Sequence, residues 1–194
     1  SLVDQLNMLF INVFAAIAIG GSVATAQYVG SRNYAKASVS ANQLLYASTA
    51  VATFFMAVML VFREPVLRLI YGQIEADVFQ NASIYFFYTL LGYPFFAMGA
   101  SATSVLRAMG KNRQAVTITI AYNVLNVIGN AILIYGFHLG VAGAAISTSV
   151  SRVVYAVLGL YLAHSSKLPA HFDKVLRFRL DMDVMGRVLR IGLS

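Results

Sequence analysis

The stretch AVTITIAYNVLNVIGNAILIYG, residues 115–136, decides the fold class of this 194-residue chain. It is almost wholly apolar except for Asn123, Asn126 and Asn130, and with Thr119 these side chains recur at intervals of four, three and four residues. On a helix this spacing places all four on one face, which we call the polar stripe. The other faces are too apolar for a soluble core helix and indicate a lipid environment. Because an unpartnered amide is costly in hydrocarbon, the polar stripe is expected to point inward, towards a bundle or a substrate path.

The composition supports a membrane protein and argues against catalysis and metal binding. Hydrophobic residues make up 59% of the chain and charged residues 11%, and the mean hydropathy is +0.74. The absence of cysteine excludes disulfides and thiolate–metal sites. His138, His164 and His171 lack the spacing of metal ligands, and there is no phosphate-binding loop, nucleophile elbow or pair of carboxylates. We therefore expect neither an enzyme nor a protein with a cofactor or a metal.

Five apolar stretches are each long enough to cross about 30 Å of hydrocarbon at about 1.5 Å per residue. They predict an all-α fold, a polytopic membrane helix bundle, with Pro94 kinking the third span. Residues 1–165 are expected to form the transmembrane bundle, and residues 166–194 a basic cytoplasmic linker that leads into a further helix. The spans are expected at about 6–29, 38–62, 82–106, 115–134 and 141–163.

The basic residues predict which end of the bundle faces the cytoplasm. Arg63 and Arg68 follow the second span, with Glu64, Glu75 and Asp77 beside them. Eleven basic residues lie at the opposite end: Arg32, Lys36, Arg107, Lys111, Arg113, Lys167, Lys174, Arg177, Arg179, Arg187 and Arg190. By the positive-inside rule this second end is cytoplasmic, and so is the carboxyl terminus, in the inner or plasma membrane of a cell. The net charge of +7 thus reflects topology, and no nucleic-acid partner is expected.

The two ends of the sequence suggest a larger protein. The chain opens with SLVDQL, without an initiator methionine, and an odd number of spans would place this end outside the cell. Residues 176–194 alternate basic and apolar side chains, which is typical of a surface helix leading into another span. We therefore expect a fragment of a transporter that also has an upstream span.

Three blocks of the sequence carry a resemblance to a known transporter family. They are GSVATAQYVGSRNYAKA (21–37), YFFYTLLGYPFFAMGASATSVLRAMGKNR (85–113) and NVLNVIGNAILIYGFHLGVAGAAISTSVSR (123–152). In their order they resemble the multidrug and toxic compound extrusion (MATE) family of antiporters, and the similarity covers nearly the whole chain. The resemblance implies two six-helix lobes that exchange H⁺ or Na⁺ for organic substrates. This chain would supply five transmembrane helices, the second to the sixth, of the amino-terminal lobe.

The resemblance also implies which residues line the substrate or cation pathway. A pair of polar residues one turn apart in the family's fifth span corresponds to Asn126 and Asn130, and in some members the second is an aspartate that takes part in cation coupling. A hydroxyl of the sixth span corresponds to Thr148, and a tyrosine of the fourth span to Tyr85. The first-span aspartate would lie upstream of Ser1. All seven acidic residues of this chain fall outside the predicted spans.

Arg152 and Asn123 complete the candidate pathway residues. Arg152 lies near the middle of the last span, one turn after Thr148, where a charge is expected to serve transport, to pair with carbonyls or a carboxylate, or to snorkel to the interface. Asparagine amides do not titrate, so Asn126 and Asn130 could hold or orient a coupling group without being one. The alternative is that the polar stripe only forms interhelical hydrogen bonds that stabilise the lobe.

These observations favour one part of a secondary active exporter that works by alternating access. Its expected partners are the lipid bilayer, the first span and carboxyl-terminal lobe of the same protein, and an aromatic or cationic organic substrate, because aromatic side chains over residues 85–96 suit stacking and cation–π contacts. One alternative is a lipid-linked oligosaccharide flippase of the same superfamily, which should line its cavity with several basic residues. Another is a membrane scaffold or assembly protein.

Overall fold

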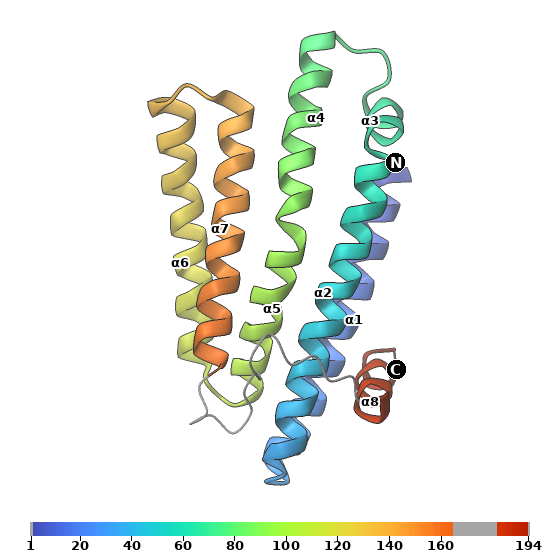
Figure 1. Cartoon of the computed structure of the whole chain (residues 1–194), viewed down its shortest axis with the longest axis vertical. Coiled ribbons are helices and arrows are strands. Elements are labelled where there is room, and N and C mark those ends of the chain that lie inside the picture. Colours follow the sequence, from blue (N-terminus) through green and yellow to red (C-terminus); the bar gives the residue numbers. More distant parts are fainter. Residues whose placement is uncertain (1, 165–181, 194) are drawn as a thin grey trace.

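The computed structural model describes residues 2–164 and 182–193, and every regular element in these two ranges is a helix. The long helices stand side by side along the long axis, and α8 lies beside the second half of α1 (Figure 1). This arrangement confirms the predicted all-α class. The elements are α1 (Leu2–Gly30), α2 (Tyr34–Val61), α3 (Arg63–Tyr71), α4 (Ala76–Leu91), α5 (Tyr93–Ala108), α6 (Asn112–Asn130), the π-helix η1 (Ala131–Gly136), α7 (Gly140–Ala163) and α8 (Met182–Leu193).

Four described segments are long and apolar enough to cross a membrane alone, and a bent pair of helices raises the number to five. The four are Asn12–Gly30, Tyr34–Val61, Asn112–Gly136 and Gly140–Ala163, and the pair is α4 with α5. The polar segment expected between the second and third spans contains the short helix α3, and α4 begins at residue 76 instead of 82. The expected boundary between bundle and linker, at residues 165 and 166, lies outside the described residues and stays a prediction.

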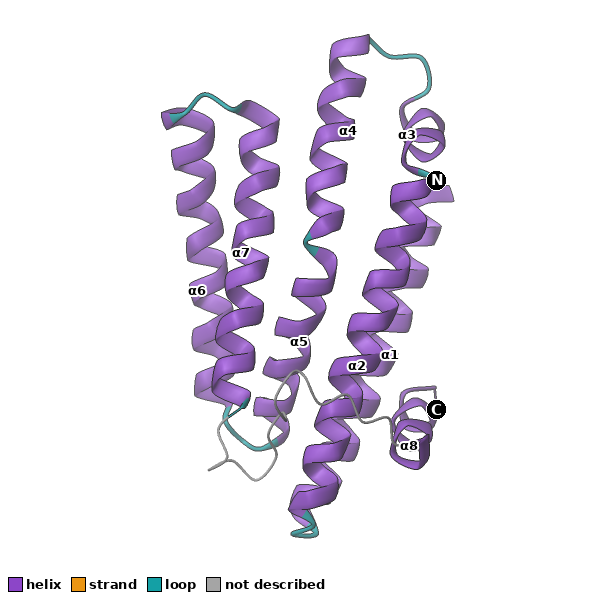
Figure 2. Ribbon diagram, in the orientation of Figure 1, coloured by secondary structure: helices purple, strands orange, loops and turns teal. Residues whose placement is uncertain are grey.

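The third span is broken at Gly92, and its two halves are bent by 41°. Pro94 occupies the first turn of α5, where its missing N–H is tolerated but cannot continue the hydrogen bonds of α4. The kink expected from Pro94 is therefore present, and the chain turns two residues before the proline (Figure 2).

The turn between α5 and α6 shows how local sequence ends a span. Gly110 has a φ of +77°, a left-handed conformation that favours glycine. Its N–H donates to the Arg107 carbonyl at 2.9 Å, and the Lys111 N–H donates to the Leu106 carbonyl at 2.8 Å. These two bonds form a Schellman motif, which satisfies carbonyls that the helix end would leave open.

Helix α7 packs against α4, α5 and α6 and occupies the middle of this half of the bundle. Small residues allow the close approach to α5: a Cβ at Gly159 would lie 2.8 Å from the Ala102 Cβ. Such contacts drive helix association in lipid, where there is little hydrophobic force between helices. At the same crossing the buried Tyr155 hydroxyl lies 3.1 Å from Thr103 Oγ1.

Helix α8 covers the end of α1 that carries Gly30. Its buried Val184 and Val188 pack with Ala24 of α1. Backbones meet at two glycines, because a Cβ at Gly20 would collide with the Val188 carbonyl, and one at Gly192 with the Ala16 carbonyl. A helix is therefore present over residues 182–193, within the stretch 176–194 that was expected to form a surface helix, and it is docked on the bundle.

Most basic side chains in the described ranges gather at one end of the bundle. This end holds the α1–α2 turn, the α5–α6 turn and α8, whereas α3 and the α6–α7 turn lie at the other (Figure 1). The first end carries Arg32, Lys36, Arg107, Lys111, Arg113, Arg187 and Arg190, and the second carries Arg63 and Arg68. The helices thus separate the charges as the positive-inside argument assumes.

Cysteine labelling tests the orientation. In the full-length protein, Gln73→Cys in the exposed α3–α4 loop should react with an impermeant thiol reagent added to intact cells, because that end is expected to face outward. Asn112→Cys, exposed at the start of α6, should react only after permeabilisation. The reverse pattern would contradict the orientation.

Candidate functional site

Helices α6 and α7 bring three of the candidate residues into one hydrogen-bonded chain, which we call the polar chain (Asn130, Asn126 and Thr148). Asn130 Nδ2 donates to Asn126 Oδ1 at 3.3 Å, and Asn126 Nδ2 donates to Thr148 Oγ1 at 3.2 Å. Thr148 Oγ1 donates in turn to the Ala144 carbonyl at 2.9 Å. Ser147 Oγ donates to the Asn126 carbonyl at 3.1 Å and so adds a second hydrogen bond between α7 and the Asn126 turn of α6.

The direction of donation leaves one acceptor open at the end of the polar chain. Each hydrogen bond of the polar chain is donated in the direction of the Ala144 carbonyl. Asn130 Oδ1 is therefore the acceptor at the opposite end, and no member of the polar chain donates to it. This oxygen is buried and has no hydrogen-bond partner among the described residues. Asn130 also ends α6, directly before the π-helix, and π-helical segments are frequent at functional sites. A buried acceptor without a partner is the feature that a cation or an acidic proton would satisfy.

The polar stripe does not act as a single unit. Asn126 and Asn130 are half-buried against α7, but Asn123 is exposed and has no hydrogen bond to the described part of the chain. Thr119 donates to the Ala115 carbonyl within its own helix at 2.9 Å. The stripe expected to point inward as a whole is therefore divided: Asn126 and Asn130 belong to the polar chain, whereas Asn123 and Thr119 do not.

Arg152 lies one turn after Thr148 but contacts α4 and α5 instead of α6. Its Nη1 donates to the Thr89 carbonyl at 2.8 Å. Its guanidinium carbon lies 5.0 Å from the ring centroid of Tyr93 and 5.6 Å from that of Phe96. Of the roles left open for Arg152, pairing with a backbone carbonyl is the one that the structure contains.

Tyr85 lies on α4 and is 41% exposed, with no hydrogen bond to the polar chain in the described ranges. Aromatic rings further along the bundle form a connected cluster. The Phe96 centroid is 5.8 Å from that of Tyr155, which is 4.9 Å from that of Tyr122. The cluster joins α5, α7 and α6 and has mainly a packing character. Among the described residues no group of three His, Cys, Asp or Glu side chains could hold a metal ion.

Three contributing residues were not singled out from the sequence. Ser147 donates to α6, Ser149 donates to the Tyr88 carbonyl of α4 at 2.5 Å, and Tyr155 anchors the aromatic cluster. A signal for the serines exists in the run ISTSVSR, residues 146–152, which is unusually polar for a span. Three neighbouring polar residues on a helix cannot all face one partner, and this indicates contacts on two sides.

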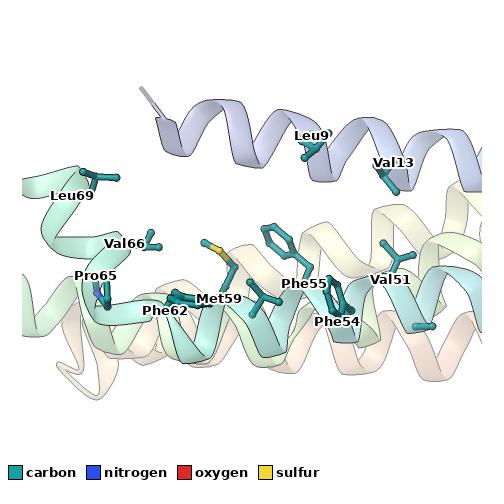
Figure 3. A pocket seen from close by; sticks show the side chains of 12 residues that line it. Leu9, Val13, Val51, Phe54, Phe55, Met59, Phe62, Pro65, Val66 and Leu69 are labelled. Carbon is teal, nitrogen blue, oxygen red and sulfur yellow. The ribbon is translucent and has the colours of Figure 1, made fainter.

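A groove of about 690 Å³ opens between α1 and the α2–α3 corner, away from the polar chain. Figure 3 shows Leu9 and Val13 of α1 facing Phe55 and Met59 of α2, with Leu69 of α3 at one end. Every side chain that lines it is apolar, so it offers no group that could fix the orientation of a polar ligand. None of the candidate pathway residues lies in it.

The geometry is that of one helical lobe of a polytopic membrane protein with a polar centre between two spans. The MatE family model matches residues 1–132, more than half of the chain. The chain therefore belongs to the MatE family, and the resemblance seen in the sequence is confirmed. The family consists of membrane transporters and not of enzymes, as expected.

The relatives agree with this assignment. An uncharacterized transporter, YisQ of Bacillus subtilis, is 29% identical over 98% of this chain and 42% of its own length. The multidrug export protein MepA of Staphylococcus haemolyticus is 25% identical over 79% of this chain and 32% of its own. The inward-facing conformation of a multidrug resistance MATE family transporter superposes with a TM-score of 0.83, at 24% identity, over 97% of this chain and 42% of that one. The chain thus spans about two fifths of the length of such relatives, and the structural likeness establishes the fold.

The α6–α7 crossing generates a stability prediction. A Cβ at Gly129 would collide with Ser147 Oγ, so Gly129→Ala should push α7 off the Asn126 carbonyl and cost about 1–3 kcal/mol. Gly136→Ala is the matched control, because that Cβ would enter open space. Thermal unfolding of the purified full-length protein should show a lower Tm for Gly129→Ala alone. Equal Tm values for both variants would contradict this packing.

Proposed function

We propose that this chain is the core of the amino-terminal lobe of a secondary active exporter of organic compounds. Its membership of the MatE family supports transport, and its similarity to the multidrug export protein MepA supports multidrug export. Because the chain covers about two fifths of its relatives, a preceding span and a second lobe would complete the protein. The two lobes would alternate access to a central cavity in the inner or plasma membrane, with the basic end of this lobe in the cytoplasm.

The open oxygen of Asn130 is the observation that carries the coupling proposal. A Na⁺ ion could bind this oxygen directly, since amide oxygens are suitable ligands for a hard cation. In H⁺ coupling, a protonated carboxyl group from another part of the protein could donate its O–H to the same oxygen. In either case Asn126 would orient the Asn130 amide by accepting a hydrogen bond from its NH₂ group, and Thr148 would orient the Asn126 amide in the same way.

Aromatic side chains along α4 and α5 support an aromatic or cationic organic substrate. Tyr85, Tyr88 and Phe95 are partly exposed along the broken span. Their rings could stack on planar molecules or attract a cation through the ring quadrupole. Asn123, exposed on α6, and Arg152, at the break, would border the path that such a substrate takes.

Two other functions have less support. A lipid-linked oligosaccharide flippase should present several basic groups to its cavity, but Arg152 is the one basic residue near the middle of a described span, and its Nη1 is engaged by the Thr89 carbonyl. A scaffold would use the polar chain as interhelical hydrogen bonds alone. A scaffold has no need for the terminal acceptor on Asn130.

Substitution of the amides separates transport from scaffolding. In the full-length protein, Asn126→Leu and Asn130→Leu should impair dye efflux from cells, because leucine fills the helix face but offers no ligand. Hydrogen bonds to charged groups are worth about 1.5–3 kcal/mol, so the apparent affinity for the coupling ion should fall by about tenfold to a hundredfold. Asn123→Leu, on the exposed part of the stripe, is the matched control and should be milder. Normal efflux by both test variants at matched expression would leave only a structural role.

Asn130→Asp tests the coupling chemistry. The variant places a titratable group at the end of the polar chain. The pH or Na⁺ dependence of efflux should therefore shift, even if the maximal rate falls. The measurement is efflux over a series of pH values and Na⁺ concentrations in energised vesicles. Dependences identical to those of the parent protein would contradict a coupling site at Asn130.

A further inference from the structure

The break between α4 and α5 exposes backbone carbonyls in the middle of a span. In a regular helix the carbonyl of each residue accepts from the N–H four residues later. The Gly92 N–H instead donates to the Thr89 carbonyl, three residues back, at 3.1 Å, and Pro94 has no N–H for the Leu90 carbonyl. The carbonyl of Tyr88 thereby loses its regular donor. Within hydrocarbon such groups must find partners in the protein.

Helix α7 supplies one donor each to the carbonyls of Tyr88 and Thr89, next to the break. Ser149 Oγ donates to the Tyr88 carbonyl at 2.5 Å, and Arg152 Nη1 donates to the Thr89 carbonyl at 2.8 Å. The two donors are three residues apart on α7, which is about one turn of helix, and their acceptors are consecutive residues. One turn of α7 therefore donates to two consecutive carbonyls at the end of α4.

The charge of Arg152 is suited to this position. Carbonyls at the carboxyl end of a helix carry a partial negative charge, and a cation there is stabilising. The guanidinium also contacts the rings of Tyr93 and Phe96 in the first turn of α5, so one side chain touches both halves of the broken span. Gly92 makes room for it, since a Cβ at that position would lie 2.8 Å from Arg152 Cδ.

The same turn of α7 holds the polar chain. Thr148 accepts from Asn126 of α6, while the next residue, Ser149, donates to α4. These adjacent side chains connect α7 to α6 and to α4. A rotation of α7 that breaks one contact would therefore disturb the other.

We propose that Ser149 and Arg152 form a clamp from α7 onto the α4–α5 break, which fixes the bend and couples it to the polar chain between α6 and α7. Both are positioning residues: they act through the carbonyls of Tyr88 and Thr89 and through the rings of α5. The clamp concerns the shape of the lobe, so it can fail while the proposed export function stands, and the reverse also holds.

Distance measurement between spin labels tests the clamp. Labels at Gln80 of α4 and Arg107 of α5, both exposed, report the angle between the two helices in the full-length protein in lipid nanodiscs. This chain has no cysteine, so the two labelled positions are unique once any cysteines elsewhere in the protein are replaced. Ser149→Ala with Arg152→Met should lengthen the mean distance by about 2 Å as the pair straightens. The same double variant should broaden the distance distribution at least twofold, as expected for a span whose bend is no longer fixed.

Three further variants separate the clamp from a general loss of folding. Thr89→Val keeps the carbonyl that Arg152 uses, and Arg152→Lys keeps a cation and a donor, so both should retain a narrow distribution. Gly92→Ala should displace the guanidinium and broaden the distribution, while Gly136→Ala, with open space around it, should not. Unchanged distances in the double variant would overturn the clamp. If that variant does not fold, equal distributions for the two alanine variants would overturn it.

Discussion

The constraint on which this lobe depends is that a polar group inside hydrocarbon must find its partner within the protein. Helices satisfy most of their own backbone, so the polar groups that need another partner can be identified. Three of them meet on helix α7: the Asn126 amide, the Arg152 guanidinium and the Tyr88 carbonyl at the break. Its position between α6 and the α4–α5 pair follows from these partners as much as from the close packing at Gly99 and Gly159.

The spans and the break were accessible from the sequence because they depend on local properties. An apolar stretch of sufficient length predicts a membrane helix, and Pro94 predicts a bend wherever the chain places it. The helical period also singled out Asn126 and Asn130, which it puts on one face, and the family resemblance added the hydroxyl of Thr148 as a candidate. What the structure adds is their order in one hydrogen-bonded chain, and an open oxygen at its end.

Other features could not be predicted, because they depend on how helices cross. Asn123 and Thr119 share the period of the polar stripe, but α7 does not cover Asn123, and Thr119 bonds within its own helix. Arg152 shares a face with Thr148 by spacing, yet its guanidinium donates to the Thr89 carbonyl of α4. The docking of α8 on Gly20 likewise depends on a tertiary contact. A periodic pattern identifies a face, and only the neighbouring helix decides what that face touches.

We propose that the polar chain takes part in ion coupling and is not only a set of interhelical hydrogen bonds. Solid-state NMR of the full-length protein with ¹³Cγ-labelled asparagine tests it directly, with Asn130→Leu used to assign the Asn130 resonance. If the Asn130 oxygen takes part in coupling, this resonance should shift and saturate as Na⁺ or pH is titrated, because the open Oδ1 gains a cation or an O–H donor. The resonance of the exposed Asn123 should stay in place. An Asn130 resonance that is indifferent to both titrations would exclude a coupling role for this oxygen.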